Sequence, residues 1–395
     1  MNSIIWTLIT FNLVSLGLTE PVLNHRTRLP VVSKLSDEYA AFVETVNTNF
    51  IDSQFNNITL NTTNHPPIDS LIKQTDARSK IVYPNLPEAS GQAGIGINFV
   101  VRNNFPFIIS LIDDGPAFRS GILPHDTIIE IDGQETKNIS IDSVAFLLKG
   151  EAGTLVRLKT RRVSESSHLF QINREIVVQK SISKSCVLDS QIGYVKIVFF
   201  QEDVKNELEK SCDSLFALGC KLIILDVRNN HGGKLLSTVD CSGLFLPKRT
   251  LICRIKQIRS RGDEILFSTS GKFTKQPLVV LVNSYTCSGA EIFALSLKEN
   301  KRACLIGSRT AGLGSVQSLL TMNKTYSMML TTGYFITSQG KSIEKVGVLP
   351  DSLIEEPKDF REIHVSNICN CHNVETPDNQ LTGAIHLARE IIRTK

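Results

Sequence analysis

The chain has 395 residues, 42% of them hydrophobic and 21% charged, which is typical of globular proteins and sufficient for two or three packed units. A formal net charge of +4 without a long basic run excludes an electrostatic case for nucleic-acid binding. The nine cysteines form no CxxC pair, so we expect free thiols and neither a metal site nor a cofactor. The one alternative, a metal site at Cys369-Asn-Cys371-His372, lacks a second pair of ligands.

Residues 1–35 predict a leader. The apolar stretch from Ile4 to Leu18 is shorter than the roughly 20 residues that a membrane span needs, and it is typical of a signal-peptide core. A basic stretch without acidic residues, 25–34, follows. We therefore expect entry into a secretory route, a secreted, lumenal or plastid-type location, and no integral membrane span in the mature chain.

Residues 36–90 predict an N-terminal helical segment. A Ser-Asp-Glu start and apolar residues at helical spacing favour a helix over 36–55 with one buried face. A polar, punctuated loop then precedes a second, short helix over Ile68 to Lys80.

Residues 91–180 change to short strands. After Gly94-Ile-Gly-Ile97, strands are expected at 98–101, 107–112 and 154–161, with a helix at 140–149. These elements fit a small α/β barrel of one module.

Residues 181–395 alternate apolar runs with helices, as a sheet with helical layers does. Strands are expected at 192–200, 221–230, 277–284 and 303–307, and helices at 204–218 and 290–299. A final helix over 376–392 has an apolar face that should pack on the core. The predicted fold class is α/β, with the small barrel inserted between the N-terminal helical segment and this sheet domain.

Two glycine-rich turns follow expected strands. "DVRNNHGG" (226–233) has paired glycines whose backbone N–H groups can point outward, and "YTCSGAEI" (285–292) places Ser288 at a strand-to-helix turn. Strand ends are where sheet proteins place their chemistry. A serine before a helix is also a common N-cap, so from spacing alone both interpretations remain open.

The segment "GPAFRSGILPHDTIIEIDG" (115–133), with the preceding Gly-x-Gly-Ile turn, resembles PDZ domains of the bacterial and plastid protease type. The resemblance implies that polypeptides are bound by their C-termini, with the carboxylate on backbone N–H groups and the last side chain in an apolar pocket. The alternative is that the two glycines only make a turn. The implied carboxylate loop is Ile95, Gly96 and Ile97, and the implied pocket wall is Val144 and Leu148.

"LDVRNNHGGKLLSTVDCSGLFLP", the segment around "YTCSGAEI" and "GVLPD" (347–351) resemble, in order and spacing, the C-terminal processing (tail-specific) proteases. The resemblance implies an α/β peptidase core to which the PDZ module presents substrate C-termini. It also implies roles for single residues. These are Ser288 as nucleophile, the amides of Gly289 and Gly233 as oxyanion hole, Glu291 and Glu299 as acidic positions on the next helix, and Gln317 as the residue that orients the base.

The base position implied by this family, 25 residues after Ser288, is occupied by Leu313 within "GSRTAGLGSVQ". The family usually has lysine there, and a buried lysine acts as a base because its pKa is depressed. Leucine has the bulk of the lysine stem but cannot accept a proton. His231 is an alternative base beside the oxyanion glycines, whereas Lys298 and Lys301 should point away from Ser288.

Two hypotheses follow. The chain is a serine-type peptidase with a weak or unidentified base, or it is an inactive pseudopeptidase that binds peptide C-termini without cutting them. A scaffold with neither activity is a third option. The oligomeric state is not indicated by the sequence.

Overall fold

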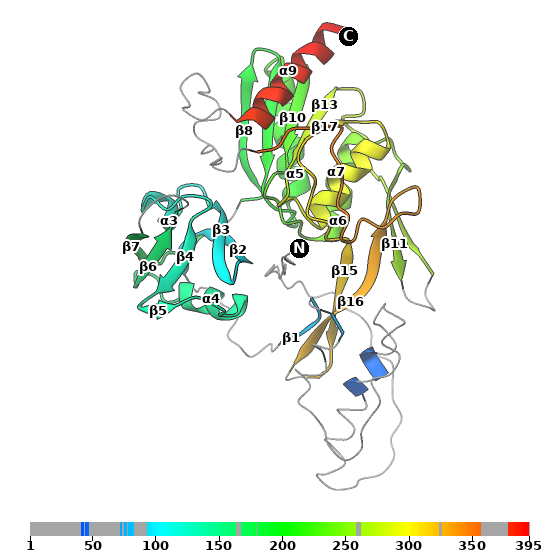
Figure 1. Cartoon of the computed structure of the whole chain (residues 1–395). Helices are drawn as coiled ribbons and strands as arrows, with labels where there is room; N and C mark the ends of the chain where they lie inside the picture. The colour runs from blue at the N-terminus through cyan, green and yellow to red at the C-terminus, as the bar shows by residue number, and fades with distance from the viewer. Residues whose placement is uncertain are drawn as a thin grey trace.

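A computed structural model describes residues 41–42, 44–46, 72, 75–76, 78–82, 93–162, 167–178, 180–257, 262–323, 326–356 and 378–394. The expected leader and the Cys369, Cys371 and His372 cluster lie outside these residues. The described chain forms three sheets, which Figure 1 shows as a small unit, a helix-covered sheet and a projecting ribbon. The α/β fold class predicted from the sequence is confirmed.

The small unit is an antiparallel sheet with strand order β2-β3-β4-β6-β7 and the short β5 paired to β4. The expected strands and helix of this region are confirmed, and β7 was not predicted. Ser140 caps α4, because its side chain accepts a hydrogen bond from Ser143 N. The bounds are β2 Ile97–Arg102, β3 Phe105–Leu111, α3 Pro116–Arg119, β4 Thr127–Ile131, β5 Gln134–Glu135, α4 Ile141–Leu148, β6 Leu155–Arg161 and β7 Ser167–Asn173.

The second sheet has strand order β17-β14-β13-β10-β9-β8, parallel except for the antiparallel pair β8 and β9. The four strands predicted from continuous apolar runs form its centre, as expected for strands buried on both faces. The bounds are β8 Ile182–Asp189, β9 Ile192–Ile197, β10 Leu222–Asp226, β13 Leu278–Val282, β14 Cys304–Gly307 and β17 Ser352–Leu353.

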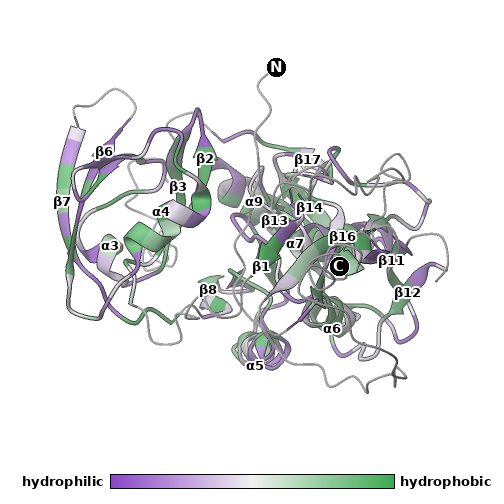
Figure 2. Ribbon diagram, turned by 90° about the horizontal axis from the view of Figure 1, so that it is seen from below, coloured by the Kyte–Doolittle hydropathy of each residue, from purple (hydrophilic) through white to green (hydrophobic). Residues whose placement is uncertain are grey.

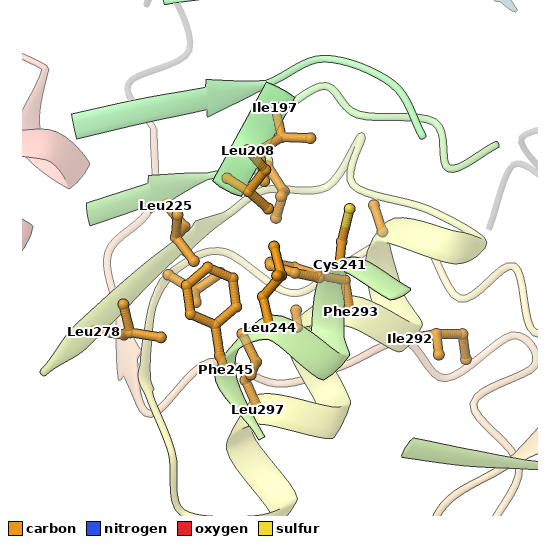
Figure 3. Close-up of a cluster of buried hydrophobic side chains, with 14 of the residues drawn as sticks. Ile197, Leu208, Leu225, Cys241, Leu244, Phe245, Leu278, Ile292, Phe293 and Leu297 are labelled. Carbon is orange, nitrogen blue, oxygen red and sulfur yellow. The ribbon is translucent and has the colours of Figure 1, made fainter. Parts of the chain in front are cut away.

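Helices cover both faces of this sheet. On β10, Ile223 and Leu225 face a large apolar cluster shared with α5 (Val204–Ala217), α6 (Leu235–Phe245) and α7 (Gly289–Glu299), part of which Figure 3 shows. The alternate residues Leu222 and Ile224 face α9 (Asn379–Thr394). This alternation follows from the two-residue period of a strand. The helix predicted at 376–392 therefore does pack on the core.

The hydropathy pattern distinguishes the covering helices. In Figure 2, α5 has both hydrophilic and hydrophobic positions, and its buried residues recur at helical spacing. Helix α6 is different, because it carries Ser, Thr, Cys and Gly at buried positions. A helix buried on most sides needs no amphipathic pattern, so α6 was not predicted.

The third sheet has strand order β1-β16-β11-β12, with β15 also paired to β16. Its bounds are β1 Lys80–Val82, β11 Leu251–Gln257, β12 Glu264–Phe267, β15 Ser315–Thr321 and β16 Ser327–Ile336. The helix predicted to end at Lys80 is wrong at that end, because residues 80–82 pair with 327–329 as a strand. Within the region 36–55, the described residues are helical, and Phe42 and Val46 are buried against Met328 and Leu330 of β16.

The cysteines differ from expectation at one position. Cys186 on β8 is disulfide-bonded, whereas the other six cysteines among the described residues are free. The expectation of free thiols is therefore wrong for Cys186, because a pair that only the tertiary fold brings together leaves no spacing signal. Among the described residues, no helix has the length and apolar character to cross a membrane.

Candidate functional site

Ser288 sits in a strained backbone conformation at the start of α7, with φ 55° and ψ −123°. Ser288 is the N-cap of α7 and shares a capping box with Glu291, but its positive φ departs from the β region that an N-cap normally adopts. Positive φ in a residue other than glycine costs energy and is often found at functional sites. Gly232 packs directly on the turn, because a Cβ at residue 232 would lie 2.7 Å from Gly289 N and 3.0 Å from Ser288 Cβ.

Two backbone amides adjoin this serine. A Cβ placed on Gly289 would lie 3.6 Å from Gly233 N, so the two glycine amides are close neighbours. Within the described part of the chain, neither amide has a hydrogen-bond acceptor. Gly233 has φ 140°, and a Cβ there would lie 2.3 Å from the carbonyl oxygen of Phe200, so only glycine fits. Such unpaired, fixed N–H groups can stabilise a developing oxyanion.

Asn230 joins the two glycine-rich turns. Its side-chain oxygen accepts from Gly232 N at 2.8 Å, and its amide nitrogen donates to Ile197 O at 2.9 Å. Its backbone oxygen accepts from Cys287 N at 3.0 Å. Asn230 is fully buried, so the turn with Gly232 and Gly233 and the turn with Ser288 are held as one unit.

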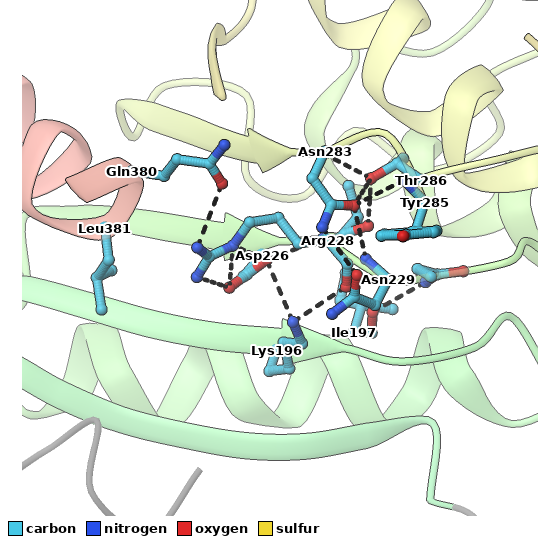
Figure 4. A network of polar contacts seen from close by, with 12 residues as sticks. Lys196, Ile197, Asp226, Arg228, Asn229, Asn283, Tyr285, Thr286, Gln380 and Leu381 are labelled. Carbon is cyan, nitrogen blue, oxygen red and sulfur yellow. Dashed lines mark hydrogen bonds and ion pairs between the residues drawn. The ribbon is translucent and has the colours of Figure 1, made fainter. Parts of the chain in front are cut away.

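A buried charge network anchors the strand end before these turns (Figure 4). Arg228 binds Asp226 at 2.7 Å and Asp378, at the start of α9, at 2.8 Å. Lys196 Nζ donates to Arg228 O at 3.0 Å. Burial alone would raise the pKa of Asp226, but the charges of Arg228 and Lys196 outweigh it and hold that pKa below its usual range.

Glu291 connects the serine turn to the loop that carries Leu313. Its Oε2 accepts from Ser288 N at 3.0 Å and from Leu313 N at 2.8 Å, so one oxygen joins the two backbones. Its Oε1 accepts from Gly312 N at 2.8 Å and from the hydroxyl of Thr310. Burial raises the pKa of Glu291, although these four hydrogen bonds oppose the shift.

Leu313 and Gln317 form the remaining part of the site. Leu313 is only 6% exposed. Gln317 Nε2 donates to Thr331 Oγ1 at 2.7 Å, whereas its Oε1 is buried without a hydrogen-bond partner in the described chain. An unpaired buried acceptor is costly.

Other candidates from the sequence are placed elsewhere. Glu299 lies at the far end of α7, about 15 Å along the helix from Ser288, and accepts from Ser338 N at 2.8 Å. Lys298 pairs with Asp351 at 2.9 Å. His231 has a buried Nε2 without a partner in the described chain, and burial lowers its pKa to about 4, so the ring is neutral at pH 7.

The candidate peptide-binding residues lie at the edge of the small sheet. Gly96 has φ 76°, and the amides of Ile95 and Gly96 have no acceptor within the described chain. Ile97 begins β2, an edge strand that could accept a further strand. Val144 and Leu148 do lie on one face of α4, but they pack in the core of the unit rather than on an open surface.

Sequence reasoning missed Asn230 and the Arg228 network as parts of the site. The polar letters of "DVRNNHGG" after an apolar strand were their only signal, because burial and pairing are properties of the fold.

The structure combines a serine at a strained strand-to-helix turn, two backbone amides without acceptors beside it, and a small sheet of the PDZ type. These features are typical of PDZ-containing serine-type peptidases. The chain matches Peptidase family S41 over residues 191–354 and a PDZ domain over residues 107–162. It is 31% identical over 298 residues to the carboxyl-terminal-processing protease of Picosynechococcus sp., covering 74% of this chain and 70% of that protein. The chain belongs to the carboxyl-terminal-processing proteases of family S41.

Two further similarities agree. The corresponding protease of Synechocystis sp. is 32% identical over 276 residues, covering 68% of this chain and 64% of that protein. The chain thus spans less than two thirds of that relative. A solved structure of a photosystem II D1 C-terminal processing protease aligns with TM-score 0.69 and 23% identity, over 86% of this chain and 98% of that one. This last similarity concerns the fold alone.

Proposed function

We propose that this chain is a serine-type peptidase that cleaves near the C-terminus of polypeptides captured by its PDZ module. The main support for this proposal is the strained Ser288, which lies beside the amides of Gly233 and Gly289, neither of which has an acceptor in the described chain. In this proposal the Ser288 hydroxyl attacks the carbonyl carbon of a peptide bond, and the two amides stabilise the oxyanion. The C–N bond then breaks, and the C-terminal fragment leaves as an amine that takes up the proton lost by Ser288. Water hydrolyses the resulting acyl-enzyme, which releases the other fragment as a carboxylic acid and restores the Ser288 hydroxyl.

The reaction lacks an identified base to accept the proton of Ser288. The position equivalent to the family's lysine carries Leu313, and Glu291 cannot act as the base, because its oxygens already accept from four donors. Loss of the base from serine peptidases costs roughly four to six orders of magnitude in rate. We therefore propose slow cleavage that depends on the oxyanion hole and on substrate binding.

A second candidate function is capture of peptide C-termini without cleavage. One observation favours it: the side chain of Leu313 is buried and cannot accept the proton of Ser288. The buried Oε1 of Gln317 also has no hydrogen-bond donor in the described chain. The same PDZ module serves both candidates, so cleavage distinguishes them.

The test is an assay on an unstructured peptide with an apolar C-terminus, comparing the unaltered protein with Ser288→Ala. We expect slow cleavage that the substitution abolishes, because the other nucleophilic group of the turn, the Cys287 thiol, is fully buried and burial raises its pKa. Mass spectrometry of the products identifies the cut bond. Cleavage that persists in Ser288→Ala would count against Ser288 as nucleophile, and no cleavage by the unaltered protein would leave binding as the function.

Peptide capture is expected to depend on a free C-terminal carboxylate. A fluorescent peptide with a free carboxylate should bind at least ~10-fold more tightly than its amidated form, because charge-assisted hydrogen bonds to the amides of Ile95 and Gly96 contribute roughly 1.5–3 kcal/mol. Titration by fluorescence anisotropy measures both affinities. Equal affinities would contradict the carboxylate loop at residues 95–97.

We also propose that the protein works in an oxidising compartment reached through an N-terminal signal. The disulfide at Cys186 supports this, since such bonds persist mainly in oxidising environments. The expected signal core, Ile4 to Leu18, lies outside the described residues.

A further inference from the structure

Three successive backbone amides around residue 313 each donate to a carboxylate. Gly312 N and Leu313 N bind Glu291. Gly314 N binds Glu344 Oε2 at 2.9 Å. A Cβ at residue 314 would lie 2.7 Å from Glu344 N, so the two backbones are in close contact. The loop that presents residue 313 is therefore held between two carboxylates from different parts of the chain.

Arg78 holds the second of these carboxylates. Its guanidinium binds Glu344 through both nitrogens, Nη2 to Oε1 at 2.9 Å and Nη1 to Oε2 at 3.0 Å. Nη1 also donates to Ser315 Oγ, directly after the loop. The side chains of Arg78 and Glu344 are only 23% and 16% exposed. A bidentate pair of this kind fixes geometry as well as charge.

The backbone of Arg78 is itself fixed to the ribbon that carries the loop. Arg78 N and Ser79 N donate to Asp76 Oδ1 at 2.8 and 2.6 Å. Ser79 Oγ accepts from Thr331 N of β16 at 3.2 Å. Strand β1, which follows directly, pairs with β16. The guanidinium is thus delivered to the loop in a defined position.

The charge of Arg78 reaches the serine turn. Burial raises the pKa of the Cys287 thiol, next to Ser288, and Glu291 adds to this effect, but Arg78 lowers that pKa. Among the described residues, the charged side chains that form hydrogen bonds with the loop or with Ser315 are Glu291, Glu344 and Arg78. Two exposed basic residues lie nearby: Lys345 donates from its backbone N to Gly312 O, and the side chain of Arg309 donates to Val346 O.

We propose that Arg78 is a positioning residue for the 313 loop. Through Glu344 it fixes the amide of Gly314, and its positive charge compensates the carboxylate of Glu344. This proposal rests on the proposed function in assuming that the 313 loop occupies the base position beside Ser288, although Leu313 itself accepts no proton. The segment before the PDZ module thereby contributes to the active site.

The first experiment uses charge changes of opposite sign in the Leu313→Lys variant. Arg78→Met leaves Glu344 uncompensated, which favours the charged ammonium, so the acidic limb of the kcat/KM profile should move up by about one pH unit. Glu344→Gln removes the negative charge, so the limb should move down by a similar amount. Arg78→Lys keeps the charge and should leave the limb in place. Losses of rate without opposite shifts would overturn the charge role.

The second experiment does not require cleavage. In the protein with Leu313 unaltered, amide hydrogen exchange at residues 312–314 should become at least 10-fold faster in Arg78→Met. The matched control is Arg389→Met, which breaks a distant ion pair with Asp189 and should leave this loop unchanged. Unchanged exchange in Arg78→Met would overturn the proposal. Faster exchange together with no Ser288-dependent cleavage by the unaltered chain would reject the proposed function and retain the positioning role.

Discussion

Leu313→Lys is expected to raise kcat/KM for an unstructured peptide with an apolar C-terminus by roughly 10²- to 10⁴-fold, the usual contribution of general base catalysis. This gain restores only part of the roughly four to six orders of magnitude that loss of a base costs. The loop is already held by Glu291, which accepts from the backbone amide of residue 313 at 2.8 Å. Only the proton acceptor is added.

The pH dependence of the Leu313→Lys variant has a definite sign. A lysine must be deprotonated to accept the serine proton, and burial at a position that is 6% exposed lowers its pKa. Activity should therefore rise with pH through that lowered pKa. Measurement of kcat/KM from pH 5 to 10 locates the pH range over which activity rises.

Two controls accompany this variant. Leu313→Met keeps the bulk without a base and should not gain activity. Ser288→Ala in the Leu313→Lys background should lose the gain completely. A Leu313→Lys protein that is folded but no more active than the unaltered chain would contradict the placement of residue 313 beside the nucleophile.

Arg228→Met should lower the free energy of unfolding by about 3–5 kcal/mol, because it leaves the carboxylates of Asp226 and Asp378 buried without their main partner. Urea denaturation measures the loss. Arg389→Met is the matched control, since it removes an arginine from an exposed ion pair and should cost less than ~1 kcal/mol. Equal losses in the two variants would contradict a buried network.

The loss in Arg228→Met should also depend on pH. The pKa of Asp226 is lowered in the folded protein, so its ionised form stabilises the fold above its unfolded pKa of about 3.9. That contribution is lost as the pH falls through the folded value. Without Arg228 the carboxylate is no longer stabilised, so the deficit should be largest at neutral pH and should shrink as the pH falls below about 5.

Local patterns in the sequence were sufficient to predict the central sheet and the two glycine-rich turns at 226–233 and 285–292. Continuous apolar runs such as 221–226 have few alternatives to a buried strand, and the glycines beside Ser288 are needed where a backbone must approach within 3 Å. The strand Lys80–Val82 was mistaken for a helix end because three residues carry no period, and only pairing with β16 defines them.

The partners of the side chains in the site could not be predicted from local sequence patterns. Glu291 and Glu299 share one helix and one residue type, and only the turn geometry shows that the first reaches Ser288 and the second does not. Arg78 and Glu344 are 266 positions apart, and no spacing rule connects them. The disulfide at Cys186 was missed for the same reason.

The pairing of β1 with β16 has a practical consequence for dissecting the protein. Boundaries taken from the two family matches, residues 107–162 and 191–354, would retain Ser288, Gly233 and Gly289. They would discard Arg78 and the strand beside it, and a truncated protein cut at those limits should appear to have a poorer active site than the full chain. Its kinetics would then describe the truncation rather than Leu313.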